Sequence, residues 1–121
     1  MIFICTNSQD PVINSALNSG STCISIGSFA PNRLEVSVGA LAKADKVFGD
    51  DAKTISEQSG SVVKTLINVE RNWDQAHSIG GVYAGKITGR ENKEQVIYYF
   101  SVGLGIQDAA LAEFILANGK F

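Results

Sequence analysis

The chain has 121 residues, of which 45% are apolar and 18% are charged, a balance typical of a single folded domain. Ten basic and twelve acidic side chains give a net charge of -2, and no stripe of Lys and Arg alternates with aromatic residues, which argues against a nucleic-acid surface. No apolar run reaches the roughly 20 residues that span a bilayer. The first residues lack the basic segment and long apolar core of a signal peptide, so we expect a cytoplasmic protein with one domain over residues 1–121.

The cysteines and the histidine give no support for a metal site. Cys5 and Cys23 both lie in short apolar runs, so we expect two reduced thiols in the core rather than a disulfide. His77 is the only histidine and lies in a polar stretch, where a solvated loop residue is the simplest interpretation. With one His and no Cys-x-x-Cys pair, we predict that no metal is bound.

Short apolar runs alternate with helical patterns along the chain. Strands are predicted over residues 2–5, 22–26, 46–49 and 95–101. Helices are predicted over residues 34–42, 50–58, 62–69 and 106–116, with a short helical turn and a loop over 79–90. This alternation indicates an α/β fold with a parallel sheet of about four strands flanked by helices. Because the first run resembles a strand buried on both faces, we expect a sheet that is cut through its middle.

Polar and small residues follow three of the predicted strands. Ligands of open parallel sheets bind beyond the carboxyl ends of the strands, so these positions are candidates for a binding site. Ordinary turns explain the same pattern equally well. The candidates are Thr6, Asn7 and Ser8 after the first strand, Gly27, Ser28 and Phe29 after the second, and Ser101, Val102, Gly103 and Leu104 after the last.

Other possible motifs are weaker. The Gly103-Leu104-Gly105 turn precedes a helix and could present backbone N–H groups to an anion, but Asp108 breaks the Gly-x-Gly-x-x-Gly pattern. That pattern occurs nowhere in the chain. Lys86 and Arg90 flank a glycine-rich loop and could meet a phosphate, although a solvated loop is favoured. The Asp50-Asp51 pair is explained more simply by a helix N-terminus than by a bound cation.

Four stretches in the same order resemble the ornithine cyclodeaminase/mu-crystallin family. The most specific is Ser101-Val102-Gly103-Leu104-Gly105-Ile106-Gln107-Asp108-Ala109-Ala110 after an apolar strand. The others are Thr6-Asn7-Ser8-x-x-Pro11-Val12, Ile26-Gly27-Ser28-Phe29-Ala30-Pro31-x-x-x-Glu35, and Gly80-x-Val82-x-Ala84-Gly85-Lys86-x-x-Gly89-Arg90. Together they are spread over nearly the whole chain, from residue 6 to residue 110.

The resemblance implies part of a two-domain enzyme, with a substrate domain and a Rossmann domain for NAD or NADP. It implies hydride transfer between a nicotinamide and a carbon bearing nitrogen, as in ketimine reductases and amino-acid dehydrogenases. By the same resemblance, Thr6, Asn7, Ser8, Gly27, Ser28, Ser101, Val102 and Gly103 would line the cofactor. Phe29 stands where the cyclodeaminases of the family have a catalytic Asp, and a phenyl ring cannot accept a proton. This departure favours a reductase or dehydrogenase, and the catalytic residues of this chain stay unassigned.

Compared with the family, the chain lacks the substrate domain and the glycine-rich first half of the Rossmann domain. We therefore expect a partial Rossmann-like sheet, little or no dinucleotide binding by the chain alone, and no activity alone. The alternative is a stand-alone, non-catalytic protein that kept the fold and acts by self-association or by binding a small molecule. In either case the edge at Ile2–Cys5 is expected to be unpaired and apolar, which predicts a homo-oligomer or a partner that supplies the missing N-terminal half.

Overall fold

The computed structural model of the protein describes residues 1–69 and 76–119 and contains a five-stranded, wholly parallel sheet. The strands lie in the order β1-β2-β5-β3-β4. This arrangement confirms the predicted α/β fold. The strand bounds are β1 Ile2–Ile4, β2 Thr22–Ser25, β3 Lys46–Gly49, β4 Ala76–Ser78 and β5 Ile97–Phe100.

The strand β4 has no counterpart among the predicted strands. It contains His77, so the interpretation of His77 as a loop residue was wrong. Its three residues carry no apolar run, and the strand exists because its backbone pairs with β3 in parallel register, with Phe48 opposite His77. The rings of these two residues lie 5.6 Å apart, and all three residues of β4 are half-buried.

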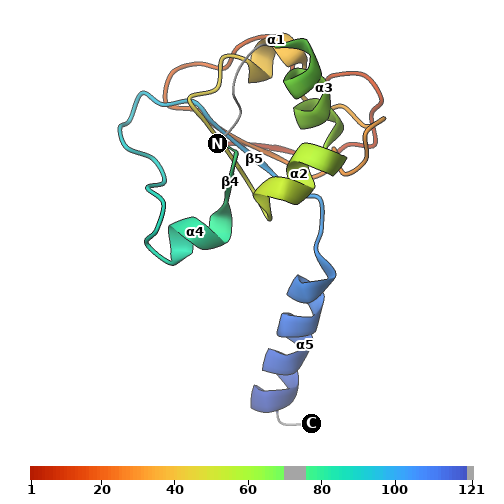
Figure 1. Ribbon diagram of the computed structural model, residues 1–121, viewed down its shortest axis with the longest axis vertical. Coiled ribbons are helices and arrows are strands. Elements are labelled where there is room, and N and C mark those ends of the chain that lie inside the picture. The colour runs from red at the N-terminus through yellow and green to blue at the C-terminus, as the bar shows by residue number, and fades with distance from the viewer. Residues whose placement is uncertain (70–75, 120–121) are drawn as a thin grey trace.

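Three helices cover one face of the sheet, as Figure 1 shows. They are α1 (Val38–Leu41), α2 (Ala52–Gln58) and α3 (Gly60–Asn68). The hydroxyl of Ser37 caps α1 and the carboxylate of Asp51 caps α2, because each accepts a hydrogen bond from a first-turn N–H that has no partner inside the helix. The helix α1 is shorter than the expected 34–42, because Val36 stays extended and forms a parallel bridge with Ile13.

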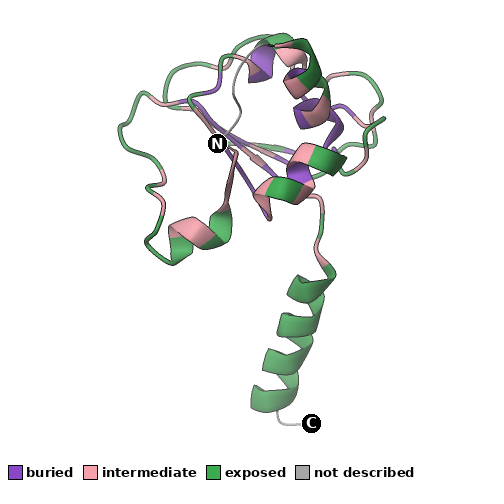
Figure 2. Cartoon of the chain, in the orientation of Figure 1, coloured by how far each residue is buried: buried purple, intermediate pink, exposed green. Residues whose placement is uncertain are grey.

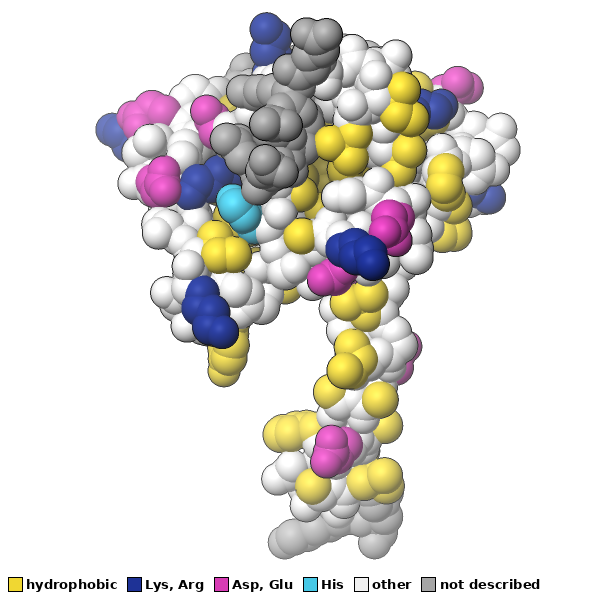
Figure 3. All heavy atoms as spheres, in the orientation of Figure 1, with side chains coloured by type: hydrophobic (Ala, Val, Ile, Leu, Met, Phe, Trp, Pro, Cys, Tyr) yellow, Lys and Arg dark blue, Asp and Glu magenta, His cyan; other side chains and the backbone are white. Residues whose placement is uncertain are grey.

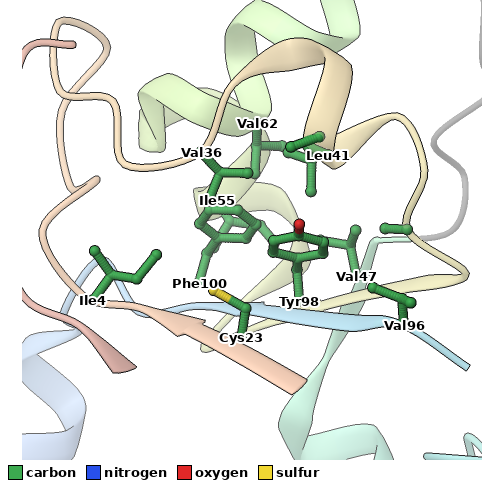
Figure 4. Close-up of a cluster of buried hydrophobic side chains, with 12 residues drawn as sticks. Ile4, Cys23, Val36, Leu41, Val47, Ile55, Val62, Val96, Tyr98 and Phe100 are labelled. Carbon is green, nitrogen blue, oxygen red and sulfur yellow. The ribbon is translucent and has the colours of Figure 1, made fainter. Parts of the chain in front are cut away.

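The core lies between these helices and the sheet (Figure 4). Alternate strand residues point toward the helices, among them Cys23, Tyr98 and Phe100, all with no exposed surface. Burial, and to a lesser extent the charge of Glu35, raises the pKa of the Cys23 thiol to about 11. Cys5 is exposed, so its predicted place in the core was wrong. It follows the last residue of β1, where the chain has already left the sheet.

The other face of the sheet carries a row of side chains in register. The strand pairing places Phe3, Ile24, Tyr99, Phe48 and His77 opposite one another in sheet order. At the β1 end this row is open, because β1 is an edge strand and Phe3 is 62% exposed. In the described part of the chain, the edge expected at residues 2–5 is formed by β1 alone, Ile2–Ile4, and Cys5 lies outside it.

The remaining helices, α4 (Ile79–Tyr83) and α5 (Gly105–Asn118), lie on the side of the sheet away from the core helices (Figure 1). The helix α5 projects from the body, and every one of its residues is exposed (Figure 2). Apolar side chains run along its length (Figure 3), including Ile106, Leu111 and Phe114. Within the described residues, none of the helices combines the length and the hydropathy needed to cross a membrane.

The loop between α4 and β5 is fastened to the sheet by two basic side chains. Lys46 of β3 donates to the carbonyl oxygens of Thr88 and Gly89 and pairs with the Glu91 carboxylate at 2.8 Å. Arg90 donates to the Thr22 hydroxyl and to the backbone carbonyl oxygens of Ser21 and Gln95. The Arg90 guanidinium thus holds protein segments together, which leaves fewer of its N–H groups free to bind a phosphate.

The N-terminus of α3 lies so close to the loop before α1 that only glycine fits there. A Cβ atom on Gly60 would lie 2.2 Å from the Arg33 carbonyl oxygen and 2.8 Å from those of Ala30 and Pro31. We expect Gly60→Ala to lower the free energy of unfolding by roughly 1–3 kcal/mol, because backbone must move to admit the methyl group. Urea denaturation of the purified variant measures this loss.

Gly39 provides the matched control. It lies in α1, and a Cβ atom there would meet nothing within 4 Å. Gly39→Ala is expected to leave stability unchanged or raise it by roughly 0.5–1 kcal/mol, as alanine does in a helix. Equal effects of the two substitutions would contradict the close packing of α3 on this loop.

Candidate functional site

The three predicted loops are brought together at one edge of the sheet. The last residues of β1, β2 and β5 are aligned by the strand register, with Ile4 opposite Ser25 and Ser25 opposite Phe100. Because these neighbouring strands are parallel, their carboxyl ends open on the same edge. The segments after them, residues 6–8, 27–29 and 101–103, therefore begin side by side. The predicted convergence is present in the structure.

The fully buried carboxylate of Glu35 joins the ends of β1 and β2. Its Oε1 accepts hydrogen bonds from the Thr6 amide at 2.5 Å and the Thr6 hydroxyl at 2.8 Å. Its Oε2 accepts from the Ser25 hydroxyl at 2.6 Å and the Gly27 amide at 2.8 Å. A carboxylate offers only acceptors, so it matches a site at which four donors converge. Glu35 thus fixes the distance between the first two loops.

The backbone around Glu35 is itself held in place, which positions the carboxylate. The Glu35 carbonyl oxygen accepts hydrogen bonds from the amides of Val12 and Ile13. Its own amide donates to the hydroxyl of Ser61, at the start of α3. The carboxylate is therefore aimed at the strand ends by contacts to two separate parts of the chain.

Gly27 shows how tightly the two loops meet. A Cβ atom at this position would lie 1.9 Å from the Thr6 carbonyl oxygen and 2.5 Å from Oε1 of Glu35. The requirement for glycine here comes from lack of space, because only Gly20, Gly85 and Gly103 have positive φ among the described residues. Any larger residue at position 27 would separate the loops that Glu35 holds together.

A second carboxylate, that of Asp50, organises the loop after β5. Its Oδ2 accepts hydrogen bonds from the Ser101 hydroxyl at 2.9 Å, the Val102 amide at 2.9 Å and the Gly103 amide at 3.0 Å, while Oδ1 accepts from the Tyr99 hydroxyl. Burial by itself raises the pKa of Asp50, but these hydrogen bonds together outweigh it and hold the pKa below its ordinary value. The turn that they stabilise has Gly103 at φ +79°, a conformation that favours glycine.

Two predicted site residues in the loop after β2, Ser28 and Phe29, play different roles. The Ser28 hydroxyl points inward, where it bonds to the hydroxyls of Ser59 and Ser61 and to the Arg33 carbonyl oxygen. It therefore ties the second loop to α3 and offers no exposed hydroxyl to a ligand. Phe29, by contrast, is 48% exposed, and the Arg33 guanidinium lies 5.9 Å from the centre of its ring.

The first loop is more open to solvent. Asn7 is exposed, and its carbonyl oxygen accepts a hydrogen bond from the Arg33 guanidinium at 2.6 Å. The hydroxyl of Ser8 donates to the Asp10 carbonyl oxygen within the same turn. Asn7 and Thr6 are both exposed, but the hydroxyls of Thr6 and Ser8 are used in hydrogen bonds within the protein, whereas Asn7 is held through its backbone carbonyl oxygen.

Sequence reasoning missed the role of both carboxylates. Glu35 was noted only as the last residue of the motif that begins at Ile26, and Asp50 was assigned with Asp51 to a helix N-terminus. The structure separates this pair, because Asp51 caps α2 while Asp50 turns toward the β5 loop. A usable signal was present for Asp50, which directly follows a strand and so lies at the same edge as the other strand ends.

Comparisons with known proteins identify relatives along nearly the whole chain. The model of the family described as "Ornithine cyclodeaminase/mu-crystallin family" matches residues 1–120. Delta(1)-pyrroline-2-carboxylate reductase of Bacillus cereus is 29% identical over 119 residues, which are 95% of this chain and 36% of the reductase. Alanine dehydrogenase of Archaeoglobus fulgidus is 36% identical over 116 residues, which are 93% of this chain and 35% of the dehydrogenase.

A solved structure agrees with the sequence relatives. An archaeal alanine dehydrogenase dimer with bound NAD superposes with a TM-score of 0.85 and 31% identity, over 97% of this chain and 37% of that chain. The five-stranded sheet therefore has a Rossmann-like neighbour that binds a dinucleotide. The chain spans about a third of the length of the relatives that it matches.

The lowered pKa of Asp50 predicts how stability depends on pH. The carboxylate has its ordinary pKa of 3.8 when unfolded and a lower one when folded, so its contribution is fully present above about pH 5. That contribution is lost as the pH falls through the folded value. We expect Asp50→Asn to be less stable than the wild type near neutral pH, and this difference to shrink on acidification. Urea midpoints measured between about pH 6 and pH 3 test this.

Asp10→Asn is the control, because Asp10 lies in an exposed turn. It should change neither the midpoint nor its pH dependence. If Asp50→Asn has the same urea midpoint as the wild type at every pH, Asp50 does not stabilise the turn through its charge.

Proposed function

Because the chain belongs to the ornithine cyclodeaminase/mu-crystallin family, we propose that its strand-end edge forms the nicotinamide side of an NAD(P) site. The proposed reaction is hydride transfer between a nicotinamide and a carbon bearing nitrogen, of the ketimine reductase or amino-acid dehydrogenase type. The observation that carries this proposal is the convergence of three loops, from β1, β2 and β5, held by Glu35 and Asp50. The named relatives are a reductase and a dehydrogenase, which fits this class of reaction.

The residues at this edge suit the binding and orientation of a ring rather than proton transfer. A bound nicotinamide would donate the hydride when reduced and accept it when oxidised. The exposed amide of Asn7 can hydrogen-bond a ribose hydroxyl, and the turn at residues 101–103 is fixed in one conformation by Asp50. The half-exposed ring of Phe29 offers an apolar surface and no acidic proton. The residues proposed to line the cofactor are Thr6, Asn7, Ser8, Gly27, Ser28, Ser101, Val102 and Gly103, with Ser28 acting through its backbone or through the packing of its loop.

The chain alone is expected to lack full activity. The sequence contains no Gly-x-Gly-x-x-Gly stretch, and the chain spans about a third of its relatives' length. In dinucleotide-binding domains, that glycine-rich turn and the helix after it hold the pyrophosphate. We therefore propose weak binding of NAD or NADP to this chain and no turnover without the remaining part of the enzyme.

A non-catalytic, self-associating protein is the alternative, and α5 is the observation that favours it. A helix with apolar side chains on all sides is usually buried against other protein, yet every residue of α5 is exposed. Under this alternative, the fold persists as a scaffold for association and the strand-end edge has no ligand. Binding of the cofactor distinguishes the two functions.

Titration of the purified chain with NADH and NADPH, followed by their fluorescence, tests the proposed site. We expect weak saturable binding, reduced several-fold by Asn7→Ala because the side chain that faces the ligand is removed. Asn118→Ala, at the far end of α5, should bind like the wild type. The absence of any saturable change at millimolar concentrations of either dinucleotide would favour the non-catalytic alternative.

We also propose a second copy of the chain as partner at the open edge of β1. The outer backbone of β1 has no neighbouring strand among the described residues, and both Met1 and Phe3 are exposed. An unpaired apolar edge readily pairs with a second strand. Two β1 edges would extend the sheet across the two copies and cover both Phe3 side chains.

Sedimentation velocity of Phe3→Lys tests this interface. A lysine in this place should shift the chain toward monomer, because a charge on an edge strand opposes pairing. Tyr83→Lys, which places the same charge on the exposed α4, should keep the wild-type state. A wild-type monomer at high concentration would contradict the proposal. Dissociation by Phe114→Lys on α5, with no effect of Phe3→Lys, would place the contact on α5 instead.

A further inference from the structure

We infer that Glu35 and Asp50 are positioning residues that make this edge accept a neutral or cationic ring and repel phosphate. The inference rests on the proposed function and goes beyond it, because it assigns a charge preference to the edge and names the two residues that cause it. It follows from the direction of the backbone N–H groups at the strand ends, which point at the two carboxylates, and from the negative charge of those carboxylates.

The N–H groups at the strand ends are already used inside the protein. Thr6 and Gly27 donate to Glu35, while Val102 and Gly103 donate to Asp50. Phosphate sites at strand–helix turns depend on backbone N–H groups that point outward at the anion. Here two internal carboxylates occupy the place that a phosphate would take relative to these groups. These four amides are therefore not available to a pyrophosphate.

The two carboxylates also leave negative charge beneath the edge. Glu35 is fully buried and Asp50 is 8% exposed. Among the described residues, neither Glu35 nor Asp50 forms an ion pair with a basic side chain. The acidic partners of the ion pairs there are Glu91, Glu57 and Glu94. Charge in a medium of low polarity acts over a longer range than charge in water. Burial, and to a lesser extent the charge of Glu35, raises the pKa of the Cys23 thiol.

One basic group lies close to this edge and could oppose the effect. Arg33 donates to the Asn7 carbonyl oxygen and lies over the Phe29 ring, on the outer side of the first two loops. Its single charge is spread over a half-exposed guanidinium, whereas the two carboxylates lie directly behind the loops. We expect the carboxylates to dominate, and the experiment includes a variant that separates the contribution of Arg33.

The consequence is a preference among ligands that contain the same ring. Oxidised nicotinamide carries a positive charge and the carboxamide donates hydrogen bonds, so both suit an edge with negative charge behind it. A free phosphate or pyrophosphate carries the wrong charge, and the four amides at the strand ends are already bound to Glu35 and Asp50. The edge is thereby matched to the nicotinamide end of the dinucleotide, and the pyrophosphate must be held elsewhere.

Backbone amide spectra of the full chain, labelled with nitrogen-15, test this inference with three probes. The probes are 1-methylnicotinamide, which is cationic, nicotinamide, which is neutral, and inorganic pyrophosphate. We expect saturable shifts near residues 6, 27 and 101–103 with the two rings, and a three- to ten-fold preference for the cation, roughly the effect of one partly screened charge. Pyrophosphate should cause no saturable shift at these amides.

Glu35→Gln should reduce the preference for the cationic ring toward unity, because it removes the charge and replaces one acceptor oxygen with a donor. Glu57→Gln removes the same charge from the exposed surface of α2 and should keep the preference. If Glu35→Gln fails to fold, Asp50→Asn provides the same comparison. Arg33→Gln should raise the preference or leave it unchanged.

Three results would overturn the inference: saturable pyrophosphate shifts at these amides, equal affinity of the wild type for both rings, or an unchanged preference in Glu35→Gln. Its failure can be told apart from failure of the proposed function. A wild type that binds NADH without preferring the cationic ring retains the function and loses the inference. A wild type that responds to neither ring nor NADH loses both, and one that prefers the cationic ring without binding NADH retains the inference alone.

Discussion

The carboxylate of Glu35 lies in the interior between the ends of β1 and β2 and accepts four hydrogen bonds, two from each strand end. An unpaired charge in this position would be very unfavourable, so the site is stable only while all four donors stay in place. Loops of this length would otherwise sample many conformations. Glu35 therefore fixes the shape of the edge on which the proposed cofactor site depends.

Asp50 repeats the arrangement on the other side of β5, where it holds the turn at residues 101–103. The buried hydroxyls of Ser28, Ser59 and Ser61 tie the second loop to α3. The parallel sheet supplies the convergence of the loops and the two carboxylates supply their conformation. A binding site built in this way is preorganised, because its loops need little ordering when a ligand arrives.

The sequence was sufficient for the four main strands, the parallel sheet and the family, because apolar runs and turn signals are local features. It was insufficient where structure depends on distant partners. The strand β4 forms through pairing with β3, and Cys5 is exposed because the chain leaves the sheet after Ile4. The loops could be placed at one edge by reasoning from parallel strands, but the inward turn of the Ser28 hydroxyl and the role of Asp50 depend on contacts 31 to 53 residues apart in the chain.

Amide hydrogen exchange at Thr6 and Gly27 tests the role of Glu35 most directly. Both amides lie outside the strands, where exchange is ordinarily fast. If the buried carboxylate holds them, they will exchange as slowly as amides of the central strand β5. Exchange at the rate of the exposed turn around Asp10 would show that the two strand ends move independently, and the account of this edge would be wrong.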